Sequence, residues 1–141
     1  MSASTQLNTG QPARDISFGV VQYITKVVAF NTLGVGTADT VKVGTLPSGA
    51  QIVKSIVRVT AAFNAATTNV LTVGTSAGSD ADIVSAADLD ESTIGTTVGT
   101  RGCDLAISAD TAIYTKYTQT GTAATTGSAV ITILYVATSN G

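Results

Sequence analysis

The sequence predicts an all-β domain, and two observations support this. The first is composition: of 141 residues, 44% are hydrophobic, but only 5% are aromatic and 11% charged, and 14 are glycines. β-Branched residues combined with frequent glycine are typical of strands joined by many turns. The second is a series of strand-length runs separated by glycine-rich turns. This pattern favours an antiparallel β-sandwich of the jelly-roll type with almost no helix.

The predicted organisation is an extended N-terminal arm, residues 1–19, followed by a single β-sandwich domain, residues 20–141. The arm is polar and lacks periodicity, so we expect it to order only against a neighbour. Ile16 and Phe18 are the apolar side chains that could anchor it. A domain of this length can bury roughly 70% of its unfolded surface, so it needs no disulfide staples.

The first strand is predicted at residues 20–31, where both faces become apolar toward the end, as in a strand covered on both sides. A short strand at 40–44 and a longer one at 51–62 are expected to form a central hairpin. The intervening Leu46-Pro47-Ser48-Gly49 favours a tight reversal, because proline and glycine suit the turn conformation.

Alternation in the strand at 51–62 predicts which side chains face the core, because successive side chains of a strand point to opposite faces. The inward face is expected to carry Val53, Ser55, Val57, Val59 and Ala61. The outward face is expected to carry Ile52, Lys54, Ile56, Arg58 and Thr60.

The rest of the chain continues the pattern of strands and loops. We expect a strand at 70–75, a loop at 76–82, a one- or two-turn helix at 85–89 capped by Ser85, a loop at 91–102, and strands at 112–119 and 128–138. The last strand is apolar on both faces, which places it centrally or beneath a partner.

The residues provide no recognisable catalytic apparatus. Histidine is absent, which excludes Ser-His-Asp and Cys-His arrangements, and the single cysteine, Cys103, is expected to be a small buried residue. Acidic residues gather at Asp80, Asp82, Asp88, Asp90 and Glu91. Their spacing does not match a calcium loop, and carbohydrate chemistry would usually bring tryptophan, which the chain lacks. We therefore expect no enzyme activity, no metal site and no cofactor.

Charge and hydropathy limit the possible partners. The net charge is −2, the pI is about 4.7 and the cations are scattered, which argues against nucleic acid. No apolar run is long enough to cross a bilayer, and residues 1–8 do not resemble a signal peptide, so we expect synthesis in a cytoplasm and no membrane partner. A mean hydropathy of +0.36 with few charges is typical either of a surface that partners cover or of a threonine-rich sheet face in solvent.

Two segments resemble a known family. Residues 41–50, Val-Lys-Val-Gly-Thr-Leu-Pro-Ser-Gly-Ala, lead into the segment 52–64, and Leu71-Thr72-Val73-Gly74-Thr75 precedes Asp80-Ala81-Asp82. This arrangement resembles the jelly-roll capsid decoration, or cement, proteins of tailed bacteriophages. The resemblance covers roughly residues 20–138. It implies a virion protein on the capsid exterior that bridges neighbouring major capsid proteins and has no catalytic residues.

The predicted partners are thus the major capsid protein and further copies of the chain, as a homodimer or homotrimer. The few charges indicate that apolar contacts carry binding, with Ile16, Phe18, Ile52 and Ile56 as the partner-binding candidates. The alternatives are a carbohydrate- or surface-binding module using Tyr23, Tyr114, Tyr117 or Tyr135, a head-tail or tail component, and a small carboxylate hydrolase.

Overall fold

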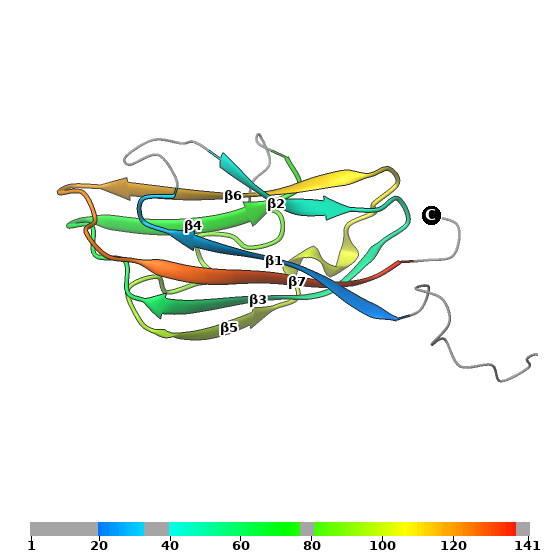
Figure 1. Ribbon diagram of the computed structural model, residues 1–141, viewed down its shortest axis with the longest axis horizontal. Coiled ribbons are helices and arrows are strands. Elements are labelled where there is room, and N and C mark those ends of the chain that lie inside the picture. The colour runs from blue at the N-terminus through cyan, green and yellow to red at the C-terminus, as the bar shows by residue number, and fades with distance from the viewer. Residues whose placement is uncertain (1–19, 33–39, 77–80, 138–141) are drawn as a thin grey trace, which may run out of the picture.

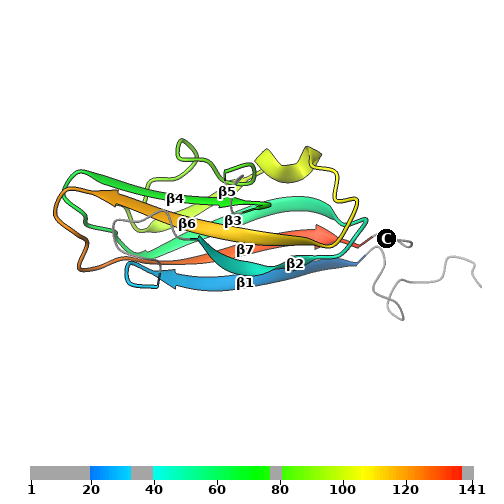
Figure 2. The same cartoon turned by 90° about the horizontal axis from the view of Figure 1, so that it is seen from above.

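The computed structural model describes residues 20–32, 40–76 and 81–137, and it confirms the predicted all-β antiparallel sandwich. Its strands run along the long axis of the molecule (Figure 1). They are β1 (Val21–Ala29), β2 (Thr40–Leu46), β3 (Gln51–Ala61), β4 (Thr68–Gly74), β5 (Gly95–Gly99), β6 (Thr111–Thr120) and β7 (Ser128–Val136). One 3₁₀ helix, η3 (Arg101–Asp104), lies toward the end of the sandwich at which β7 terminates (Figure 2). The arm at residues 1–19 lies outside the described residues.

The two sheets have the strand orders β1-β7-β3-β5 and β2-β6-β4. Successive strands along the chain therefore lie in opposite sheets. The prediction of a hairpin is wrong, because β2 and β3 belong to different sheets and do not pair. The turn between them does form: the Ala50 amide donates to the Pro47 carbonyl at 3.0 Å, and Gly49 has a φ of 86°. A positive φ is easily reached only by glycine, which explains its position in this reversal. The turn carries the chain from one sheet to the other.

The core lies between the sheets and consists mainly of β-branched and small side chains. Its largest fully buried side chains are Phe63 and Tyr117, whose ring centroids are 4.8 Å apart. The inner face of β7 contributes Ala129, Ile131, Ile133 and Tyr135. Since β7 pairs with β1 on one side and β3 on the other, its predicted central position is confirmed. Among the described residues no helix is long and apolar enough to cross a membrane.

The predicted outward position of Ile52 is wrong. Ile52 is only 2% exposed, whereas Val53, expected in the core, is 36% exposed. The register between β3 and β7 shifts between Ile52 and Lys54, as in a β-bulge. One extra residue reverses the facing of the residues before it. The alternation predicted for Ser55, Val57 and Val59 holds, because they follow the shift.

Two further predictions fail in the segment between β4 and β6. The loop expected at 91–102 contains β5, which pairs with β3 from Ser55↔Gly99 to Val59↔Gly95. The helix expected at 85–89 is a turn, in which the Ser85 amide donates to the Asp88 carboxylate at 2.9 Å. Asp88 in turn donates its amide to the Ser85 carbonyl at 3.0 Å, so these local bonds replace a helical turn.

We predict that Gly127→Ala lowers the free energy of unfolding by about 2–4 kcal/mol. Gly127 has a φ of 145°, and an added Cβ would overlap the buried ring of Phe63. The control is Gly95→Ala, because a Cβ there meets no atom within 4 Å. Urea titrations of both variants measure the difference. Equal midpoints for the two variants would contradict the packing described at Phe63.

Candidate partner-binding surface

The outer face of the four-stranded sheet is formed by four rows of side chains that cross the strands. The registers pair Val21 with Val136, Tyr23 with Leu134, Thr25 with Thr132 and Val27 with Val130. From β7 the rows continue to Lys54, Ile56 and Arg58 of β3, and then to Val98 and Thr96 of β5. The hydroxyls of Thr25 and Thr132 lie 3.2 Å apart, which shows that these rows share a face. We call this set the outer sheet face.

The outer sheet face is unusually apolar for a solvent-exposed surface. Tyr23 is 64% exposed, Val27 61% and Val98 57%. Within the described part of the chain, every exposed large hydrophobic side chain belongs to β1, β3 or β5 or directly precedes β1 or β5. None belongs to the three-stranded sheet. Contiguous exposed apolar surface of this kind marks an interaction site.

Charge is also distributed unevenly over the described residues. The outer sheet face carries Lys54 and Arg58, and none of its residues is acidic. The described acidic residues all lie between Asp82 and Asp110, in the loops around β5 and η3. The outer sheet face is therefore positive, although the chain as a whole has a net charge of −2.

Of the two predicted partner-binding residues that the structure describes, Ile56 lies on the outer sheet face, between Thr132 of β7 and Val98 of β5. Ile52 is in the core, and Ile16 and Phe18 lie outside the described residues. The sequence interpretation named Tyr23 only for the alternative binding module and missed Val27, although their alternation with Ile24 and Val28 was visible. It also missed Val98, which stands among glycine and threonine with no periodicity.

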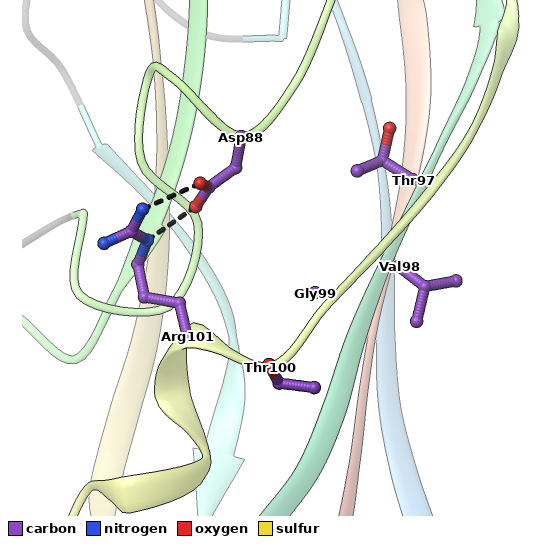
Figure 3. A pocket seen from close by; sticks show the side chains of 6 residues that line it. All are labelled: Asp88, Thr97, Val98, Gly99, Thr100 and Arg101. Atoms are coloured by element: carbon purple, nitrogen blue, oxygen red, sulfur yellow. Dashed lines mark hydrogen bonds and ion pairs between the residues drawn. The ribbon is translucent and has the colours of Figure 1, made fainter.

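A second candidate site is a cavity of about 470 Å³ beside β5, lined by Asp88, Thr97, Val98, Gly99, Thr100 and Arg101 (Figure 3). Arg101 donates two hydrogen bonds to Asp88, from Nε at 2.6 Å and from Nη2 at 2.7 Å. The Arg101 guanidinium and the Ser85 amide hold the pKa of the Asp88 carboxyl well below its ordinary value of 3.8. The carboxylate is therefore ionised and already occupied by a fork of two donors.

Asp80 of the predicted acidic cluster lies outside the described residues, and the remaining acidic side chains stabilise separate parts of the structure. Asp82 accepts from the amide and the hydroxyl of Thr75 at 2.9 and 2.6 Å. Asp90 accepts from Ser92 and Thr93. Glu91 is 5% exposed and accepts from the Leu71 amide at 3.1 Å, and burial raises its pKa. Among the described residues no three acidic, cysteine or histidine side chains are grouped as a metal site would require.

Of the four tyrosines considered for a carbohydrate- or surface-binding module, Tyr23 is 64% exposed on the outer sheet face, Tyr114 is half-buried and the other two are packed into the core. Tyr117 is fully buried and donates to Asn69 Oδ1 at 2.6 Å, and Tyr135 is 9% exposed. They cannot provide a stacking surface for sugars in this fold. Cys103 is half-buried and donates to the Val53 carbonyl at 3.0 Å. The cavity beside β5 contains a single carboxylate, Asp88, so it lacks the carboxylate pair of a glycoside hydrolase.

No protein-family model matches the sequence, and no curated protein matches it. Solved structures do match. A chain in the capsid asymmetric unit of cyanophage Pam1 is similar with a TM-score of 0.67 and 23% identity, covering 95% of this chain and 94% of that one. A chain in the acid-stable capsid of Helicobacter pylori bacteriophage KHP30 gives a TM-score of 0.63 and 18% identity, covering 86% and 91%. A chain in the capsid of Ralstonia phage GP4 gives 0.53 and 15%, covering 87% and 88%. At these identities the comparisons establish a shared fold.

We predict that Asp88→Asn lowers the midpoint temperature of unfolding at neutral pH by roughly 1–3 °C, because an exposed ion pair contributes little. Since folding lowers the pKa of Asp88, the contribution of the pair is present above the ordinary value of 3.8 and is lost as the pH falls below it. The difference between wild type and variant should therefore shrink from pH 7 toward pH 2. Thermal unfolding followed by circular dichroism measures it.

Asp104→Asn, which changes an exposed carboxylate of η3, is the control for the loss of one negative charge. A wild-type advantage over Asp88→Asn that grows on acidification would contradict the assignment of the ion pair.

Proposed function

We propose that this protein is a structural component of a bacteriophage virion that binds the outer surface of the capsid and bridges neighbouring major capsid proteins. The observation that carries the proposal is the similarity, over at least 86% of this chain, to chains from three phage capsid structures. The likeness extends to nearly the whole length of each matched chain, so it concerns the complete sandwich and not a shared hairpin.

The strand orders support the jelly-roll assignment that belongs to this proposal. An eight-stranded jelly-roll consists of two four-stranded sheets, and here the β2-β6-β4 sheet has one strand fewer. An isolated antiparallel bridge joins Val73 of β4 to Val84, and it occupies the position next to the outermost strand of this sheet. We interpret the segment around Val84 as the shortened eighth strand.

The outer sheet face supports a role in assembly. A protein that works alone in water normally covers its sheets with polar side chains on the solvent side. Here β1 and β7 carry apolar residues on both faces, and the described residues cover only the inner face. A partner that covers the outer face would provide the second layer expected for such strands. A carbohydrate-binding role has less support, because Tyr117 and Tyr135 are in the core and the exposed Tyr23 lies on the outer sheet face, which has no acidic residue beside it.

We predict that the protein binds purified capsids with a saturating stoichiometry and remains bound at salt concentrations up to about 1 M, where the Debye length is about 3 Å. The physical reason is that apolar contacts, which salt does not screen, provide most of the binding free energy. Co-sedimentation with capsids over a salt series measures this. Binding to isolated tails or connectors but not to capsid shells would instead identify a head-tail or tail component.

We predict that Ile56→Asp weakens capsid binding about tenfold or more without unfolding the domain, because the charge would be buried beneath the partner. Val70→Asp is the matched control. Val70 is a half-buried β-branched residue that pairs with Thr118 on the outer side of the three-stranded sheet. Capsid binding by Ile56→Asp equal to that of Val70→Asp, with both variants folded, would argue against the outer sheet face as the binding surface.

A further inference from the structure

The edges of both sheets carry features that hinder the addition of a further strand. On β1, Lys26 lies on the same inner side as Ile24 and Val28. A charged side chain that points inward on an edge strand hinders pairing with a strand of another molecule. β5 has only five residues and begins and ends with glycine. β2 has a register shift between Lys42 and Gly44, and β4 is bridged by Val84. A partner is therefore expected to meet a face of the sandwich and not an edge strand.

The cations of the outer sheet face have a defined arrangement. Lys54 and Arg58 lie on the same side of β3 with Ile56 midway between them, about 13 Å apart at the usual rise of a strand. Their neighbours on β7 are Leu134 and Val130. Two cations thus flank an apolar centre, and no carboxylate on this face neutralises them.

This arrangement disfavours a second copy of the same face as the occupant. Two outer sheet faces packed together would enclose the Lys54 and Arg58 of both copies with no acidic residue of either face among them. Enclosed charges without partners are costly, whereas a carboxylate opposite each cation would offset much of that cost. The occupant that the charges favour is therefore a different surface, one that carries acidic groups.

We infer that the outer sheet face docks onto an apolar protein surface that carries two carboxylates about 13 Å apart, one opposite Lys54 and one opposite Arg58. The inference rests on the proposed function, which makes this surface part of the capsid shell. The apolar rows formed by Val27 and Val130 and by Tyr23 and Leu134 lie against the same surface. Ion pairs enclosed by these side chains are screened much less than exposed ones, which agrees with salt-tolerant binding.

The test compares charge reversals at exposed cations on the two sheets. Arg58→Glu changes the outer sheet face, and Lys42→Glu makes the same charge change on β2 of the three-stranded sheet. At about 0.15 M salt we expect Arg58→Glu to weaken capsid binding about tenfold and Lys54→Glu/Arg58→Glu about a hundredfold. Lys42→Glu should bind within about twofold of wild type, because it lies outside the proposed contact. If a charge reversal reduces the β-sheet circular dichroism signal and so indicates unfolding, the neutral variants Arg58→Gln and Lys54→Gln replace it in the binding assay.

A second measurement identifies the occupant directly. A carbodiimide joins an amine to a carboxylate in direct contact, so in capsid-bound protein it should link Lys54 to an aspartate or glutamate of the shell, which peptide mass spectrometry would locate. A link from Lys54 to a carboxylate of another copy of this chain would overturn the inference in favour of self-association.

The outcomes separate the two proposals. If the wild-type protein does not bind capsids, the proposed function fails. If the wild type binds and the Lys54 and Arg58 variants bind equally well, the function stands and the inference about the docking surface is overturned.

Discussion

The structure depends on burying one face of each sheet against the other with very little aromatic side-chain volume. Phe63 and Tyr117 are the largest fully buried side chains, and most of the remaining core is valine, isoleucine and alanine. Small side chains fill the core to normal density only when the two sheets are close together. At this spacing the Phe63 ring lies against Gly127, where a Cβ would overlap it. The core needs only the inner face of the four-stranded sheet. The apolar side chains of the outer sheet face therefore remain exposed.

The fold class and most strands could be predicted because they depend on local patterns. β3 was expected at 51–62 and is found at Gln51–Ala61, and β7 was expected from Ser128 and begins there. β5 could not be found, since its stability comes from pairing with β3 and not from its own glycine and threonine residues. The helix expected at 85–89 failed for a related reason: Asp88 bonds to Ser85 and to Arg101, and the latter lies 13 residues away.

The candidate site was predictable only in part. Alternation placed Ile56 on the outside correctly, but the same rule failed for Ile52, because the sequence gives no sign of the bulge before Lys54. The outer sheet face also joins strands that are distant in the chain: Tyr23 lies beside Leu134, and Ile56 beside Val98. Such a surface follows from sheet register, which single-strand patterns cannot supply. The acidic cluster was visible in the sequence, yet its described members form separate hydrogen bonds.

The position of β7 between β1 and β3 also governs when the domain can form during synthesis. β1 is made early, but its hydrogen-bonded neighbour is the last strand of the described chain. The four-stranded sheet therefore remains open until β7 has left the ribosome, and closing it requires contacts between residues more than a hundred positions apart, such as Thr25 and Thr132. Pairing of such distant segments is slow compared with local folding. The outer sheet face, which β7 completes, is consequently absent from nascent chains that still lack β7, so a partner can meet it only after β7 has emerged.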